Sequence, residues 1–160
     1  MSETNIQQVG ADSPYVASVK EMLKDLFSYL SANGILMPLT ANGEEIWFKS
    51  IEKTIDGKFG ILLGAFTDST IAGFVHCMIR FAPAYLGTHK VGYISQLYVN
   101  PIHRKTSVGR LLVKSAEEWF KSKNVHSFEL SVHATNSNGI RFWKKMGFAD
   151  ELIQMRKFPE

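Results

Sequence analysis

"LYVNPIHRKTSVGRLLV", residues 97–113, joins a short apolar run to an amphipathic run through a polar loop. The hydrophobic period changes across the loop, which predicts a strand that ends at Val99 and a helix that begins near Ser107–Val108. Backbone amides at a helix N-terminus lack intrahelical partners and carry partial positive charge. Because Arg104, Lys105 and Arg110 surround this end, the segment is either an anion-binding turn or an ordinary capped helix with solvated basic side chains.

Outward from this turn, the patterns predict two helices, then an antiparallel meander, then alternating strands and helices. The first helix is expected to be capped by Ser13, with Pro14 at its first position, and to stop at Asn33-Gly34. The remaining predicted elements are a helix over 43–55, strands over 58–66, 70–82, 90–99 and 127–132, helices over 108–124 and 136–146, and one or two closing strands over 147–158. This order predicts one α+β domain with a mixed sheet.

Composition narrows the class of protein. The chain has 160 residues, of which 45% are apolar and 21% charged, which is ordinary for one globular domain with its own core. Cys77 is the single cysteine, so no intrachain disulfide can form, and a reducing compartment is expected. We see no signal peptide, no apolar run long enough to span a membrane and no metal-ligand spacing, and we predict a cytoplasmic protein without a metal.

Charge is unevenly distributed along the chain. Residues 101–145 carry a net charge of +6, whereas residues 1–100 carry −2. Such a basic block can receive a polyanionic ligand, or it can be the solvated face of two helices. We expect no nucleic-acid partner, because the sequence has no zinc-finger spacing, aromatic RNA-reading motif or basic zipper.

Two motifs together resemble a known family. Val99 to Gly109 reads V-x-P-x-x-R-x-x-S-x-G, which is similar to the acetyl-CoA motif of the GNAT superfamily of N-acetyltransferases. "LSVHATNSNGIRFWKKMGF", residues 130–148, resembles the second motif of that family. The order and separation of the motifs also match, and the resemblance covers nearly the whole chain.

The resemblance implies a fold and a division of the chain. The implied fold is a GNAT-like α+β domain, with a mixed, mostly antiparallel sheet of about six or seven strands and about four helices. Two central strands are expected to splay apart at a cofactor cleft. Residues 1–58 would form a helical acceptor-side region, and residues 59–160 would form the sheet and the acetyl-CoA-binding core.

The resemblance also implies binding roles for single residues. The amides of residues 104–110 would hold the pyrophosphate of acetyl-CoA, the acetyl donor, and the strand edge around Leu97–Val99 would pair with its pantetheine arm. The implied cofactor-binding residues are Leu97, Val99, Arg104, Lys105, Thr106, Ser107, Val108, Gly109, Arg110, Asn136, Phe142 and Trp143. Ser107 replaces a glycine usual in the family, and its small hydroxyl side chain can still donate to phosphate.

The expected catalytic acid is missing. Trp143 stands where the family often has a tyrosine that protonates the leaving thiolate, and an indole N–H is no proton donor near neutral pH. A thiol pKa of about 8.5 lets the thiolate leave without an obligatory acid. Tyr98 and His133 are candidate catalytic residues, whereas Ser95 and Gln96 stand where some members carry a carboxylate base. A base acting through water is therefore expected.

The acceptor is predicted to be a small-molecule or peptide primary amine that enters beside the N-terminal helices. Tyr29, Glu44 and Trp47 are the candidate acceptor-binding residues, because an acidic and aromatic entrance suits a cation. The alternative to an enzyme is a non-catalytic acyl-CoA-binding regulatory domain. The closing strands could pair across two chains, which makes a homodimer a possible assembly.

Overall fold

The computed structural model describes residues 2–160 and contains one mixed sheet covered by helices on both faces. Five strands lie in the order β1-β2-β3-β4-β5. They are β1 (Thr4–Gln8), β2 (Gly60–Thr67), β3 (Thr70–Phe81), β4 (Lys90–Val99) and β5 (Ser127–Leu130). Neighbours from β1 to β4 are antiparallel, and β4 pairs with β5 in parallel, so the predicted mixed, mostly antiparallel sheet is confirmed.

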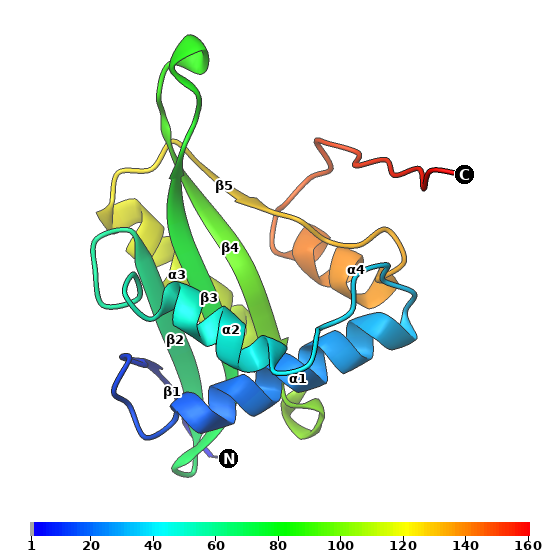
Figure 1. Ribbon diagram of the computed structural model, residues 1–160. Coiled ribbons are helices and arrows are strands. Elements are labelled where there is room, and N and C mark those ends of the chain that lie inside the picture. The colour runs from blue at the N-terminus through cyan, green and yellow to red at the C-terminus, as the bar shows by residue number, and fades with distance from the viewer. Residues whose placement is uncertain (1) are drawn as a thin grey trace.

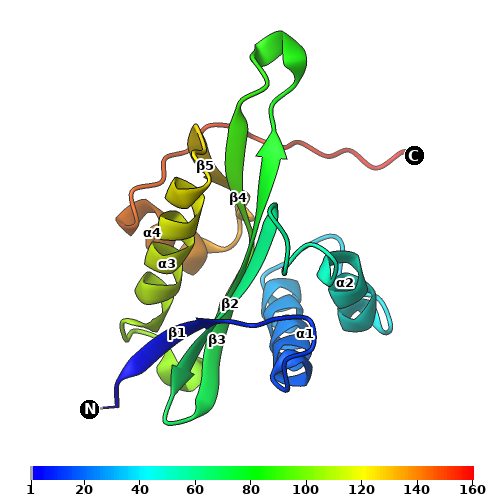
Figure 2. The same cartoon turned by 90° about the vertical axis from the view of Figure 1, so that its left-hand side faces the viewer.

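The predicted number of four α-helices is also confirmed. They are α1 (Val16–Ala32), α2 (Gly43–Ile51), α3 (Val108–Ser122) and α4 (Ser137–Lys145). Helices α1 and α2 cover one face of the sheet, and α3 and α4 lie on the other (Figures 1 and 2). Two short 3₁₀ turns, η1 (Ala84–Leu86) and η2 (Pro101–His103), flank β4. No helix within residues 2–160 is long and apolar enough to cross a membrane.

Each face of the sheet has its own apolar core, because β2 and β3 are buried on both sides. The core under α1 and α2 contains Leu23, Ile55 and Phe74, whereas the core under α3 contains Leu112 and Phe120. These five side chains are fully buried. Alternate residues of β3 therefore face opposite cores, which explains why apolar side chains occupy both faces of this strand, with buried His76 as a polar exception.

The predicted sheet of six or seven strands is not confirmed. The closing strands predicted over 147–158 do not form, and residues 149–160 have no regular structure and are exposed. A strand needs a neighbour for its backbone hydrogen bonds, and this segment runs outward from the sheet (Figure 1). β1, which the sequence patterns did not predict, supplies the fifth strand by pairing with β2.

Helix boundaries differ from the predictions at two places. α1 begins at Val16 rather than after Ser13, since the Ser13 hydroxyl accepts from the amide of Tyr15 (3.2 Å) and closes a turn ahead of the helix. α2 ends at Ile51, and a tighter turn carries the chain on to Ile55.

Candidate functional site

The turn after β4 places an open helix end beside basic side chains. Ser107 precedes α3, and its side chain does not cap the helix. The first hydrogen bond of the helix runs from the Leu111 amide to the Ser107 carbonyl (2.9 Å). The backbone amides of Gly109 and Arg110 therefore have no acceptor within the helix and can donate hydrogen bonds to a bound ligand. Lys105 adopts the left-handed conformation (φ 59°), which bends the loop into the helix. Partial positive charge and nearby cations make this end suited to a phosphate.

Arg104 is part of this loop, but its side chain turns back toward the sheet. Its Nε donates to the Val99 carbonyl (2.9 Å), and its guanidinium lies over the rings of Tyr29 (5.3 Å) and Tyr98 (5.5 Å). Arg104 thus connects the end of β4 to α1. Lys105 and Arg110 are the other exposed basic residues at the start of α3.

The second half of β4 has a strand neighbour on one side only within residues 2–160. Pairing with β5 covers Val91 to Ile94, whereas pairing with β3 continues to Val99. The edge at Ser95–Val99 can therefore accept an extended chain through backbone hydrogen bonds. Beside it, α4 leans on the start of α3, so closely that a Cβ on Gly109 would lie 3.3 Å from Phe142 and 3.6 Å from Val99. The fold thus brings together Val99, Gly109 and Phe142.

Trp143 lies in an aromatic cluster rather than alone at the surface. Its ring is edge-on to those of Phe142 (centroids 5.0 Å apart) and Phe148 (5.4 Å), and it packs against the core under α3. Packing of this kind fixes the orientation of α4 relative to the sheet.

Asn136 and Tyr29, predicted to contact different substrates, lie together. The Asn136 Oδ1 accepts from the amide of Gly139 (3.0 Å), which caps α4, and from the Tyr29 hydroxyl (3.3 Å). A Cβ on Gly139 would overlap the side-chain amide of Asn136, so glycine leaves room for this cap. The Asn136–Tyr29 pair joins α4 to α1.

A row of polar side chains joined by hydrogen bonds lies across β3 and β4, and the sequence patterns did not predict it. Ser95 is the extra residue of a bulge in β4, since His76 pairs with Gln96 and Cys77 with Ile94. The Gln96 Oε1 accepts from the Ser95 hydroxyl (2.7 Å) and from the Trp47 Nε1 (3.2 Å). The Ser95 hydroxyl also bonds to the His76 Nδ1. Only the pair "SQ" in an otherwise apolar strand hinted at this chain.

His76 is 1% exposed, and its Nε2 has no hydrogen-bond partner within residues 2–160. Burial lowers its pKa to about 4, and the nearby Gln96 side chain opposes part of that shift. The imidazole is therefore neutral at physiological pH. With Nδ1–H donating to Ser95, Ser95 donates in turn to Gln96, and the unpartnered Nε2 carries only a lone pair.

The two catalytic candidates have different surroundings. Tyr98 is 5% exposed, and its pKa is raised by burial and by the charge of Asp25, while Arg104 acts in the opposite direction. Its phenol is therefore neutral near pH 7. His133 is exposed in the loop after β5.

The acceptor candidates lie on α1 and α2. Tyr29, Glu44 and Trp47 are half-buried on the face of the sheet that carries Tyr98 and His76. Glu45, next to Glu44, pairs with Lys20 (2.8 Å). Cys77 faces the opposite core, and burial raises the pKa of its thiol, which argues against a nucleophilic cysteine.

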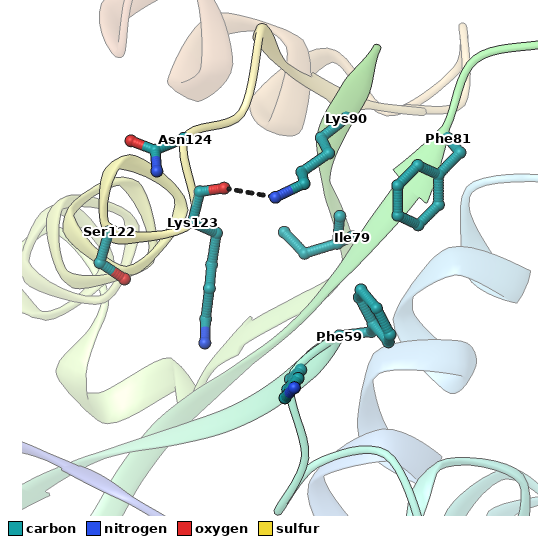
Figure 3. A pocket seen from close by; sticks show the side chains of 8 residues that line it. Phe59, Ile79, Phe81, Lys90, Ser122, Lys123 and Asn124 are labelled. Carbon is teal, nitrogen blue, oxygen red and sulfur yellow. Dashed lines mark hydrogen bonds between the residues drawn. The ribbon is translucent and has the colours of Figure 1, made fainter. Parts of the chain in front are cut away.

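A hollow of about 430 Å³ lies elsewhere, between the far end of α3 and the strands (Figure 3). Phe59, Ile79 and Phe81 form its apolar wall, and the Lys90 Nζ donates to the Lys123 carbonyl (3.4 Å) beside it. The α3 helix has 15 residues, so this hollow is roughly 20 Å from the open amides. None of the predicted site residues lines it. Within residues 2–160, no three metal-ligating side chains gather into a cluster.

Residues 21–148 match the model of the acetyltransferase (GNAT) family. The chain belongs to this family. It is 35% identical over 91 residues to a spermidine N(1)-acetyltransferase of Thermoplasma acidophilum, a match that covers 57% of this chain and 52% of the relative. It is 24% identical over 115 residues to an aminoglycoside N(6')-acetyltransferase type 1 of Acinetobacter haemolyticus, which covers 70% of this chain and 78% of the relative.

Two solved structures share the fold of this chain. A mutant of the BH1408 protein of Bacillus halodurans superimposes with a TM-score of 0.80 at 19% identity, covering 98% of this chain and 99% of the other. The aminoglycoside N-acetyltransferase AAC(6')-Iy, solved with CoA, gives a TM-score of 0.76 at 17% identity, covering 98% and 96%. The GNAT-like α+β fold expected from the two motifs is therefore confirmed.

Proposed function

We propose that this chain transfers an acetyl group from acetyl-CoA to a primary amine by direct attack in a ternary complex. The observation that carries the proposal is the junction of β4 and α3, where an unpaired strand edge runs into open helix amides. The edge at Leu97–Val99 suits an amide-bearing arm, and the amides of Gly109 and Arg110 suit a pyrophosphate. Family membership supports the same assignment.

The residues at this junction fit acetyl-CoA if one side chain, that of Arg104, adjusts its position. Pairing along β4 would compete with Arg104 for the Val99 carbonyl, so the Arg104 side chain has to move or share that oxygen. Thr106, Ser107 and Val108 line the loop and the start of α3, and Phe142 and Trp143 close the side toward α4.

In the reaction, the amine nitrogen attacks the thioester carbonyl carbon, the C–S bond breaks, and the thiolate leaves. A backbone amide near Val99 is the candidate donor to the oxyanion. The amine must first lose a proton. An imidazole with a pKa of about 4 is far too weak a base for an ammonium with a pKa of about 10. We therefore propose that water relays the proton out of the site to a base in solution, and we give His76 the role of holding Ser95 and Gln96 in place.

For the acceptor, we propose a small polycationic amine that enters beside α1 and α2. Relatives named for spermidine and aminoglycosides support this class. Glu44, Trp47 and Tyr29 offer one carboxylate and two aromatic rings to such a cation. The acidic balance of residues 1–100 favours the same ligand.

The test combines binding with turnover. Titration calorimetry with acetyl-CoA should show binding, and spermidine or an aminoglycoside should release free thiol from acetyl-CoA. The Lys105→Glu variant should bind acetyl-CoA several-fold more weakly, because it removes a cation beside the open amides. Lys53→Glu is the matched control, since it reverses an exposed lysine in the turn after α2 and should bind normally.

Three outcomes would change the assignment. Binding without thiol release across polyamines, aminoglycosides, amino acids and peptides would favour the alternative, a regulatory acyl-CoA-binding domain. Two observations favour that alternative. Tyr98 is buried with a raised pKa, and no carboxylate bonds to Ser95 in the part of the chain that the structure describes. Absence of acetyl-CoA binding would exclude both functions, and equal affinities of the two lysine variants would exclude the junction as the phosphate site.

A further inference from the structure

The hollow between the far end of α3 and the strands has the size of a ligand pocket. Its volume is about 430 Å³, and segments that are distant in the sequence form it (Figure 3). They are the start of β2, the end of β3, the start of β4 and the end of α3. Ligand pockets commonly have volumes of roughly 300–1,000 Å³, so this hollow can hold a small molecule.

One wall of the hollow is aromatic and is held in place by the sheet. Phe59 and Phe81 are 50% and 52% exposed, and their rings meet edge-on with centroids 5.8 Å apart. The Phe59 carbonyl accepts from the Ile79 amide (2.8 Å), which fixes the start of β2 against β3. Ile79 continues the apolar wall toward Lys90 (Figure 3). Half-exposed rings of this kind can stack with a further aromatic ring.

The other side of the hollow is positively charged. Lys58, Lys90 and Lys123 line it, and no acidic residue of the described chain does so. None of these lysines forms an ion pair within residues 2–160. Like charges around one hollow repel each other, and a bound anion would remove that repulsion. The same charges would repel a polycationic amine, which distinguishes this hollow from the proposed acceptor site.

Contacts with α3 place two of the ammonium groups. The Lys123 Nζ lies over the ring of Trp119 (5.5 Å), and the Lys90 Nζ donates to the Lys123 carbonyl (3.4 Å). The last carbonyls of a helix carry partial negative charge, which opposes an anion at this end. Lys90 covers one of these carbonyls and keeps its other N–H donors for a ligand.

We propose that this hollow binds a small aromatic anion, a flat ring that carries a carboxylate or sulfonate group. The ring would pack on Phe59 and Phe81, and the anionic group would accept from Lys90 and Lys123. An inorganic anion would leave the aromatic rings exposed, whereas a neutral ring would leave the ammonium groups unpaired. The hollow is separate from the junction of β4 and α3, and the proposal is independent of acetyl transfer.

The first experiment tests the charged side with anilinonaphthalene sulfonate, an aromatic anion whose fluorescence reports an apolar site. The full wild-type chain should bind the dye saturably, and Lys123→Glu should bind it about ten-fold more weakly, because a charged donor is lost. Lys121→Glu is the matched control, since Lys121 is exposed in the last turn of the same helix and does not line the hollow. Equal affinities of the two variants would overturn the proposal.

The second experiment tests the aromatic wall and the location of the dye. Phe81→Ala should bind the dye several-fold more weakly, whereas Tyr85→Ala should bind it normally, because Tyr85 is 85% exposed farther along the same hairpin. Lys105→Glu, at the start of α3, should also leave the affinity unchanged. A weaker affinity in Lys105→Glu would place the dye at the β4–α3 junction and would overturn the proposal.

The third experiment separates the two features of the ligand by competition with the dye. Naphthoate should displace the dye, and naphthamide, a neutral molecule of nearly the same shape, should require about ten-fold higher concentration. Acetate, which has the charge without the ring, should not displace it. Equal potency of naphthoate and naphthamide would show that the lysines do not contribute. Displacement by acetate would show a nonspecific anion contact, and either result would overturn the proposal.

Discussion

The helices α3 and α4 lie on the same face of the sheet, yet they are anchored very differently. α3 buries five residues, from Val108 to Phe120, whereas no residue of α4 is fully buried. The region from β1 to α3 has a complete core on both sides of the sheet. The region from β5 to residue 160 has a four-residue strand, a surface helix and an exposed segment.

This difference indicates that the first region is stable through its own packing, while the second depends on other contacts. The second region holds its place through an aromatic cluster, through the Asn136–Tyr29 hydrogen bond and, as proposed, through acetyl-CoA. Regions with few buried apolar contacts open at a low free-energy cost, and binding sites are commonly found there.

The largest expected effect comes from replacing one phenylalanine in each of the two regions. Phe120 of α3 is fully buried and stacks on Phe128 (5.3 Å), whereas Phe142 of α4 is half-buried. Phe120→Ala should lower the free energy of unfolding by about 3–5 kcal/mol, and Phe142→Ala by about 1–2 kcal/mol. Urea denaturation measures the two values. Equal losses would contradict the comparison.

The second test concerns the first region and its buried polar residue, His76. The pKa of His76 is about 4 in the folded protein and near 6.5 in the unfolded chain, so acid protonates the unfolded chain first. Stability is therefore unaffected above pH 6.5 and falls as pH drops from 6.5 toward 4, by about 3 kcal/mol from this residue. The expected result is a smaller loss over this range in His76→Gln than in the wild type.

Carboxylates also titrate in this range, so the measurement is a difference between proteins. Unfolding free energies of wild type, His76→Gln and the exposed-site control His133→Gln are compared from pH 7 to pH 4.5. The control should follow the wild type. A His76→Gln curve parallel to the wild type would show that the buried imidazole does not contribute.

Local patterns predicted the elements of the first region well because each is dominated by its own packing. The strand over 90–99 and the start of the helix at Val108 are found where they were predicted. β1 was missed because its sequence, "TNIQQ", has one isoleucine among polar residues, and only its pairing with β2 makes it a strand. The closing segment, residues 149–160, shows the reverse case, since it alternates like a strand but pairs with no strand within residues 2–160.

The two motifs located the junction of β4 and α3, but the chain of His76, Ser95 and Gln96 could not be predicted. Its members come together through the bulge that moves the β3–β4 register by one residue. Register between distant strands depends on the whole sheet, so no local pattern contains it. The position of the Arg104 side chain over Tyr98 likewise depends on how α1 packs against the sheet.

The N-terminal cap of α4 tests the second region, with a smaller expected change in the free energy of unfolding. Asn136→Ala should cost about 1 kcal/mol, because the Gly139 amide loses its acceptor. Gly139→Ala alone should change stability little, since the gain of about 1 kcal/mol in helix propensity is offset by displacement of the Asn136 amide. In the Asn136→Ala background the same substitution should give the full gain. Equal effects in both backgrounds, measured by urea unfolding, would show that the two residues are independent.

Trp143 tests whether the second region takes part in proton transfer or only packs beside the site. The expected effect is the smallest of the series, and the test rests on the proposed activity. Trp143 packs between Phe142 and Phe148 and has no acidic proton, so thiolate departure should not depend on it. Trp143→Tyr should retain the rate of thiol release within about two-fold, with an unchanged pH profile, because a thiol pKa of about 8.5 needs no acid. Trp143→Phe is the control that makes the same reduction in size without a hydroxyl. A faster rate with a new alkaline limb in the tyrosine variant alone would show that proton delivery had limited the reaction, and that the aromatic cluster had replaced a catalytic acid with packing.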